Sequence, residues 1–298
     1  MTVLSDDRRL LFELERRLDN LEKPEIPDVQ TPPPDDDILT AFTTGMAVIQ
    51  SFMALTGFWP MTSAIAQENI TEAYQHVTDV SGNVTHLSFD TTHTPVIHHA
   101  NGFPVMDCRS GGYLEASNSR LRNSCIVTHT IDAGVTVGVL ARLQEGAASF
   151  NTLIGVRGNA TANREVYLIH RRDLATGIFD AEVRGEDSAG DPAHMYARME
   201  NVQIDVWTLY IARFQIAAQS RITLFVGQDT LQRVDVTDNV LARVNVTTIP
   251  FRVGAGGDDA STMAYQPGEY ALPFYVASAV PDEQIERLYD AVRPILVA

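Results

Sequence analysis

Cysteine is scarce in this sequence: a chain of 298 residues carries two, Cys108 and Cys125. Two cysteines cannot build a disulfide framework, and neither lies in a Cys-x-x-Cys or Cys/His spacing that would hold a metal. We interpret both as small buried hydrophobic residues. The cysteine content therefore excludes disulfide-rich scaffolds and cysteine-based metal sites.

Long apolar runs are also missing. No stretch approaches the ~18–20 apolar residues of a membrane-spanning helix, which argues against membrane insertion. The segment Met1–Asp7 leads directly into charged residues, without the apolar core of a secretory signal peptide. We therefore predict no signal peptide and expect the protein to be made in a cytoplasm.

Positive charge is in short supply. The chain has 22 Lys plus Arg against 38 Asp plus Glu, which gives a formal net charge of −16. Such a surface repels phosphate backbones, and no basic cluster longer than Arg171–Arg172 offsets it. Nucleic acid is therefore excluded as the expected partner.

The common catalytic patterns are absent. A glycoside hydrolase needs two carboxylates flanking the sugar, as an E-x-D-x-x-E strand supplies. The nearest approaches, Asp180-Ala181-Glu182 and Glu186-Asp187, lack the third acid, and we interpret them as solvated strand ends. Nucleophile-elbow, P-loop and dinucleotide-binding patterns are missing too. We predict that the protein is not an enzyme.

Four of the eight histidines lie close together in the sequence: His86, His93, His98 and His99. A zinc or iron site would need two or three histidines at strand spacing together with a carboxylate. His98 and His99 would point to opposite faces of a strand. We therefore interpret this group as polar loop residues and predict no metal there.

The first 23 residues carry a regular apolar repeat. Leucines occupy a and d positions of a heptad broken only at Asp7: Leu4, Leu11, Leu14, Leu18 and Leu21. The repeat predicts a coiled coil over residues 1–23, because an isolated helix of about twenty residues is marginal in water. We expect a homo-oligomer, with a trimer favoured. Packing of the stripe on the chain's own globular domain is the alternative.

Proline separates this helix from the next segment. Pro24, Pro27 and Pro32–Pro34 remove amide donors and favour polyproline II, so residues 24–37 are predicted to be a semi-rigid linker. A second amphipathic helix is predicted over residues 38–53 from apolar side chains at spacings of three and four: Leu39, Phe42, Met46, Ile49 and Met53. The spacing leaves open whether this helix continues the stalk or packs beneath the following domain.

The composition and patterning of residues 54–298 are typical of β-structure. Short segments rich in Val, Ile, Phe, Tyr and Thr alternate with turn residues: Val135–Leu143, Glu165–His170, Ile204–Phe214, Arg221–Val226, Phe251–Val253 and Leu272–Ala277. Many short strands without intervening helices predict a sandwich or jelly roll. Alternation in Ile204–Phe214 gives Trp207, Leu209 and Ile211 as the expected inward face of that strand. One late helix is predicted at Pro281–Tyr289.

Several motifs occur in a characteristic order in this region. They are an aromatic strand at Gly57–Met61, an Asp-x-Ser-Gly-Asn turn at Asp79–Asn83, a Gly-x-Tyr-Leu strand at Gly111–Leu114, the hairpin Trp207–Arg213 with Arg221–Gly227, the segment Pro250–Gly254, and the closing Tyr275–Tyr289. The ordered set resembles laminin-G-like, concanavalin A-like lectin domains. The resemblance implies a mainly β jelly-roll sandwich over residues 54–298, here preceded by an N-terminal α-helical coiled-coil arm.

The resemblance also implies ligands. Laminin-G-like domains often hold calcium at a sheet rim and bind carbohydrate or protein there. The glycine-rich loop Gly254–Ser261 carries Asp258 and Asp259, which could hold calcium through carboxylate oxygens, although a solvated turn is the simpler interpretation. Tyr113, Tyr265 and Tyr270 are candidates for an aromatic sugar platform.

The predicted domain organisation is typical of a viral appendage: a coiled coil, a proline spacer and a lectin-like head. We expect a non-enzymatic virion protein of a tailed bacteriophage, a fibre or decoration protein that contacts host-surface glycans or neighbouring virion proteins. Its expected location is the virion. The alternatives are a secreted bacterial carbohydrate-binding module and a purely structural protein–protein interaction domain.

Overall fold

The computed structural model describes residues 36–61, 76–77, 79–83, 87–89, 95–109, 112–116, 134–145, 151–157, 166–173, 177–215, 219–238, 241, 251–256 and 264–298. The predicted coiled coil at residues 1–23, with its leucines from Leu4 to Leu21, lies outside the described residues. The predicted linker lies outside them up to residue 35. Residues 35–298 form one unit by their contacts.

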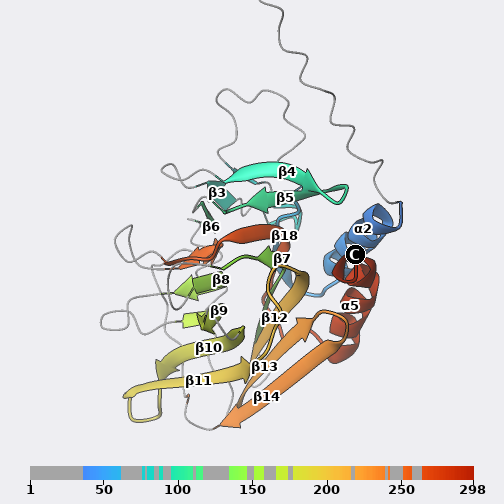
Figure 1. The fold of residues 1–298 in the computed structure, drawn as a ribbon. Coiled ribbons are helices and arrows are strands. Elements are labelled where there is room, and N and C mark those ends of the chain that lie inside the picture. Colours follow the sequence, from blue (N-terminus) through green and yellow to red (C-terminus); the bar gives the residue numbers. More distant parts are fainter. Residues whose placement is uncertain are drawn as a thin grey trace, which may run out of the picture. The chain divides into compact units, whose positions relative to one another are not determined.

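Two eight-stranded antiparallel sheets make up most of the described chain (Figure 1). Sheet A contains, in spatial order, β14 (Leu231–Asp238), β13 (Ser220–Gly227), β12 (Trp207–Gln215), β7 (Gly134–Leu143), β18 (Gly268–Val276), β5 (Phe103–Asp107) and β4 (Val96–Ala100), with β1 (Leu55–Phe58) also paired to β18. Sheet B contains β11 (Pro192–Met199), β10 (Ile178–Glu186), β9 (Val166–Asp173), β8 (Asn151–Arg157), β15 (Phe251–Val253), β6 (Leu114–Ala116), β3 (Leu87–Phe89) and β2 (His76–Val77). A short hairpin pairs β16 (Ala255–Gly256) with β17 (Ala264–Tyr265).

The two sheets face each other across an apolar core. Val137 and Val139 of β7 and Tyr210 of β12 contribute from sheet A, whereas Ile169 of β9 and Phe179 of β10 contribute from sheet B. Successive side chains of a strand point to opposite faces, so each of these strands also presents a second set of residues away from the core. The structure thus confirms the mainly β sandwich that the resemblance to concanavalin A-like domains implied.

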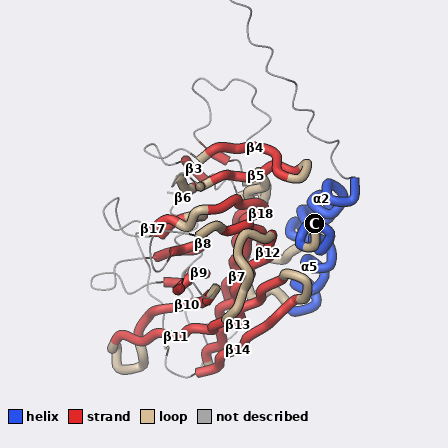
Figure 2. The backbone as a smooth tube through the Cα atoms, in the orientation of Figure 1, coloured by secondary structure: helices blue, strands red, loops and turns tan. Residues whose placement is uncertain are grey.

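Two helices, α2 (Asp36–Gln50) and α5 (Asp282–Leu296), cover the outer face of sheet A (Figure 2). The sequence left open where the second amphipathic helix belongs. The structure places α2 against α5, with Phe42 stacked on Phe103 of β5 at a ring-centroid distance of 5.0 Å. Gly45 permits this close packing, because a Cβ atom there would lie 2.6 Å from Cγ1 of Val292. Neither described helix is long and apolar enough to cross a membrane.

The helix layer changes the interpretation of β12. Trp207, Leu209 and Ile211 are buried, but they pack with the helices on the outer face of sheet A. Tyr210 and Ala212 face the opposite sheet instead. The predicted inward face was therefore wrong, because a strand buried on both sides has two apolar faces and alternation alone cannot say which one meets the other sheet.

The start of α5 is held by side chains of sheet A, and the predicted late helix is confirmed. An Arg213 Nη1 group donates to the carbonyl oxygen of Val280 at 2.8 Å and to Oδ1 of Asp282 at 2.6 Å. Arg233 of β14 also pairs with Asp282. Acidic residues in a first turn interact favourably with the helix dipole, so these contacts fix α5 on the sheet.

The Asp-x-Ser-Gly-Asn turn anchors β1. Oδ1 of Asp79 accepts hydrogen bonds from the backbone N–H groups of Phe58 at 3.0 Å and Ser81 at 2.8 Å. Nδ2 of Asn83 donates to the carbonyl oxygen of Leu55 at 2.9 Å. Gly82 occupies a left-handed conformation with φ of 89°, which favours glycine. This motif therefore has a structural role in the fold.

Candidate functional site

The outward side chains of β9, β10 and β11 form a polar surface on sheet B. In β10, Phe179, Ala181 and Val183 enter the core, so the residues between them point outward. In β11, Ala193, Met195, Ala197 and Met199 do the same. We call the outward set the polar face, and it comprises His170, Asp180, Glu182, Arg184, His194, Tyr196 and Arg198.

Ion pairs connect the polar face across three strands. Arg198 binds both oxygens of Asp180, through Nε to Oδ1 at 2.8 Å and through Nη2 to Oδ2 at 2.9 Å. Nε2 of His170 lies 3.1 Å from Oε2 of Glu182, and Nε of Arg184 donates to Oε1 of Glu182 at 2.5 Å. Such charge-assisted, forked contacts fix the orientation of each side chain.

Burial makes these pairs stronger than ordinary surface contacts. Asp180 is 2% exposed and Glu182 is 7% exposed, although both point away from the core. Burial alone would raise the pKa of Glu182, but hydrogen bonds from His170 and Arg184 outweigh it and lower the pKa to about 2. The hydrogen bond to Asp180 raises the pKa of Arg198.

These observations correct the interpretation of Asp180-Ala181-Glu182 as a solvated strand end. Both carboxylates lie within β10 and are buried in ion pairs. A carboxyl group with a pKa of about 2 is ionised at neutral pH, whereas the general acid of a glycoside hydrolase needs a raised pKa. Asp180 and Glu182 are thus suited to holding the basic side chains beside them in place.

Tyr196 differs from the rest of the polar face because it is an aromatic residue that is 41% exposed. Among the residues whose burial the structure describes, it is the one Phe, Tyr or Trp side chain that is clearly exposed. The guanidinium of Arg198 lies 5.0 Å from the ring centroid, and the His194 ring stacks at 6.2 Å with an interplanar angle of 12°. The Tyr196 ring is therefore held in a fixed orientation by Arg198 and His194.

Two of the three predicted tyrosines meet near the other end of sheet B. The rings of Tyr113 and Tyr265 lie 6.0 Å apart, and the guanidinium of Arg252 lies 5.6 Å from the Tyr113 centroid. Nε of Arg252 donates to Oε2 of Glu115 at 3.1 Å. This cluster repeats the combination of tyrosine, arginine and carboxylate that is seen around Tyr196.

The third predicted tyrosine does not belong to a binding surface. Tyr270 is fully buried between the sheets, and its hydroxyl donates to the carbonyl oxygen of Gln266 at 2.6 Å. Burial raises the pKa of this hydroxyl. The prediction was wrong for Tyr270, because in β18 the tyrosine occupies a position that faces the core. Asp258 and Asp259, the predicted calcium ligands, lie outside the described residues.

The sequence interpretation missed the polar face, although a signal for it was present. Residues 193–199 alternate small or sulfur-containing apolar residues with His194, Tyr196 and Arg198, which is the period of a strand exposed on one side. The contact between Arg198 and Asp180 could not be deduced in this way, because it depends on the register between β10 and β11.

Comparisons with known proteins give distant resemblances. No protein-family model matches the chain, and no curated protein sequence matches it. The binding domain of botulinum neurotoxin serotype D, solved with N-acetylneuraminic acid, aligns with 83% of this chain at a TM-score of 0.48 and 9% identity. This chain covers 52% of that domain, or about half its length.

Two further solved structures align at similar levels. Domain 4 of AbnA, an extracellular arabinanase of Geobacillus stearothermophilus solved with arabinotriose, covers 80% of this chain and 98% of its own, with a TM-score of 0.44 and 10% identity. The enzymatically active domain of tailspike protein 2 of bacteriophage CBA120 covers 70% of this chain and 31% of its own, with a TM-score of 0.45 and 11% identity. Resemblances this distant do not transfer a ligand or an activity to this chain.

Proposed function

We propose that this chain is a non-enzymatic carbohydrate-binding β-sandwich and that the polar face is its binding surface. The observation that carries the proposal is the exposed ring of Tyr196, held between Arg198 and His194 on an otherwise polar surface. A pyranose ring presents C–H groups on one face and hydroxyls at its edges. The exposed part of the Tyr196 side chain can contact these C–H groups, and the fixed donors and acceptors beside it can bond the hydroxyls.

The ion pairs prepare this surface for binding. Arg198 uses Nε and Nη2 on Asp180, and its side chain remains 28% exposed. A guanidinium has five N–H donors, so donors remain for a ligand hydroxyl after the fork with Asp180 is made. Because the groups are already ordered, a sugar would cost little side-chain entropy on binding.

The test is a binding measurement with the wild-type chain and matched variants on an immobilised panel of bacterial and animal surface glycans. Tyr196→Ala should weaken binding at least about tenfold, because the exposed aromatic contact is lost. Tyr196→Phe keeps the ring and should bind as the wild type does. Val96→Ala serves as the control, because Val96 is 59% exposed on β4 of the other sheet. Equal binding by Tyr196→Ala and wild type would overturn the proposal.

The setting that we propose for this domain is a virion fibre or decoration protein. The support is the heptad of leucines at residues 1–23 followed by the proline-rich segment, which suits an oligomeric stalk. Light scattering should give a trimer for the full chain and a monomer for a chain that starts at Asp35. The truncation must end before α2, because Phe42 and Ile49 of this helix belong to the apolar core between the helices and sheet A. A monomer in both cases would contradict the stalk.

A further inference from the structure

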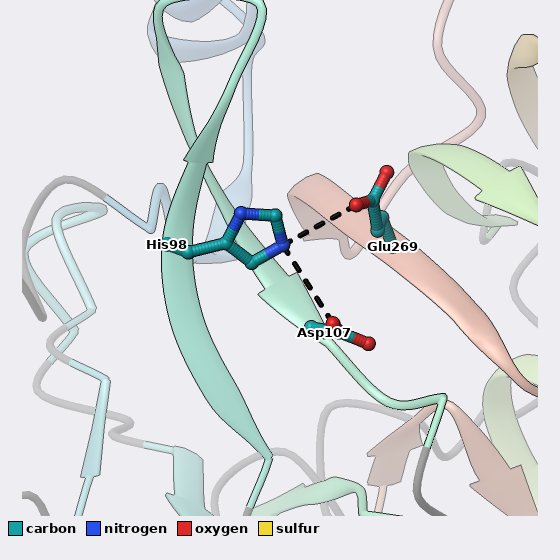
Figure 3. A group of neighbouring side chains, drawn as sticks. All are labelled: His98, Asp107 and Glu269. Carbon is teal, nitrogen blue, oxygen red and sulfur yellow. Dashed lines mark ion pairs between the residues drawn. The ribbon is translucent and has the colours of Figure 1, made fainter. Parts of the chain in front are cut away.

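Three potential metal ligands meet at the outer face of sheet A, where β4, β5 and β18 lie side by side (Figure 3). Asp107 and Glu269 are cross-strand partners, and His98 reaches them from the edge strand β4. The Glu269 side chain is 3% exposed, that of Asp107 is 14% exposed and that of His98 is 34% exposed. His98 and His99 thus lie in a strand, which corrects their interpretation as loop residues.

The donor atoms are spaced as ligands of one ion. Nε2 of His98 lies 3.2 Å from Oε1 of Glu269 and 3.7 Å from Oδ2 of Asp107, and one ligand atom from each residue lies within 4.8 Å of the other two. Tetrahedral zinc with ligand distances near 2.0–2.1 Å needs donor atoms roughly 3.3 Å apart. A metal ion could therefore contact all three after small side-chain adjustments.

The hydrogen bonding of His98 supports a cation between these groups. Nδ1 of His98 lies 3.1 Å from the carbonyl oxygen of His99, so Nδ1 carries the proton that this contact needs. Nε2 is buried and lies within ion-pair distance of both carboxylates, but the contacts lack the geometry of a hydrogen bond. In the neutral imidazole, its lone pair then faces two carboxylates, an arrangement that a bound cation would stabilise.

The remaining carboxylate oxygens are held by other groups. Oε2 of Glu269 accepts from Nε of Arg142 at 2.8 Å, and this arginine lies 5.6 Å from the ring centroid of Trp207. Oδ1 of Asp107 accepts from the backbone N–H of Arg109 at 2.9 Å. Such outer contacts orient ligating carboxylates. Oε1 of Glu269 and Oδ2 of Asp107 face His98, and Oδ2 of Asp107 also accepts from Arg109.

Arg109 is the competitor for this position. Its guanidinium also binds Asp107, through Nε to Oδ1 at 2.9 Å and to Oδ2 at 2.8 Å. The Arg109 side chain is 45% exposed, so it can turn into solvent if a metal ion takes its place beside Asp107. The Arg142 side chain is 33% exposed and packs on Trp207. A dication would therefore displace Arg109 and retain Arg142.

We propose that His98, Asp107 and Glu269 form a three-ligand site for a divalent transition metal ion, with zinc as the best match. One imidazole and two carboxylates suit zinc better than calcium, which prefers oxygen ligands alone. Water would complete the coordination. The ion would join β4 and β5 to β18 where β5 and β18 share two register pairs, Asp107 with Glu269 and Met106 with Tyr270. This inference does not depend on glycan binding.

The experiment is calorimetric titration of the untagged, metal-free full chain with zinc chloride. The wild type should bind zinc, and His98→Gln should weaken the binding at this site at least about tenfold, because a ligand is lost. The matched control is His99→Gln, since His99 is exposed and follows His98 in β4. Arg109→Gln should instead bind at least about tenfold more tightly, because a competing positive charge is removed.

The same samples give a second measurement, the melting temperature with and without zinc. Zinc should raise it in the wild type and more in Arg109→Gln, but not in His98→Gln. Identical zinc affinities in His98→Gln and His99→Gln would overturn the proposal. It would also be overturned if Arg109→Gln, which loses only an exposed ion pair, folded normally and bound no zinc.

Discussion

The outer face of sheet A presents Trp207, Leu209 and Ile211 to two helices, whereas the outer face of sheet B presents Asp180, Glu182 and Arg198 in ion pairs. Both faces arise from strands that alternate around one shared core. The apolar face is buried by α2 and α5, because exposed apolar area of that size is unfavourable in water. The polar face needs no such cover and can present Tyr196. The proposed glycan-binding surface therefore lies on sheet B, and the helix layer is expected to determine stability.

The largest expected effect on stability comes from removing a contact between a helix and sheet A. Phe42→Ala should lower the free energy of unfolding by about 3–5 kcal/mol, because it removes a buried ring packed on Phe103. Leu39→Ala, in the same helix but 40% exposed, is the control and should change it by less than about 0.5 kcal/mol. Urea unfolding measures both. Equal effects would mean that α2 is not part of the packed core in solution.

A second test compares the acid sensitivity of the polar face. The folded-state pKa of Glu182, about 2, lies below its ordinary value of 4.5, so ionised Glu182 stabilises the folded state above pH 4.5. That stabilisation, on the order of 3 kcal/mol, should disappear as the pH falls from 4.5 towards 2. Glu182→Gln should be less stable than wild type at pH 6, and the difference should vanish near pH 2. A difference in the free energy of unfolding between the two proteins that does not change with pH would contradict a folded-state pKa of about 2 for Glu182.

A third test removes one partner of a buried ion pair on the polar face. Arg198→Met should destabilise the protein by about 2 kcal/mol, because the buried carboxylate of Asp180 loses its forked pair with the guanidinium. The double variant Arg198→Met with Asp180→Asn should recover most of the loss. Absence of recovery in urea unfolding would show that Arg198 acts through packing on Tyr196 and not through its charge.

The smallest expected effect on stability belongs to the residue with the largest expected effect on binding. Tyr196→Ala should change the free energy of unfolding by less than about 1 kcal/mol, since the ring is exposed and loses only its contacts with Arg198 and His194. Thermal unfolding and glycan binding should be measured on the same sample. A large loss of stability would mean that Tyr196 supports the fold.

Sequence reasoning predicted the fold class more fully than the site. The strands around Val135–Leu143 and Arg221–Val226 and the helix after Pro281 were recognisable from local patterns, because periodicity and turn residues act over a few positions. Tyr113 and Tyr265 were selected as surface aromatics, and the structure brings them together. Tyr270 was selected by the same reasoning and is buried, because local composition does not reveal which face of a strand is covered.

The sequence by itself determined the strand alternation, the acidic charge, the scarcity of cysteine and the start of α5. Tertiary structure decided which alternating face meets the helices and which polar residues meet each other. His98, Asp107 and Glu269 come from three strands, and Arg198 reaches Asp180 only through the pairing of β11 with β10. The physical reason is that alternation has a period of two residues, whereas contacts between strands depend on sheet order and register, which the whole chain sets.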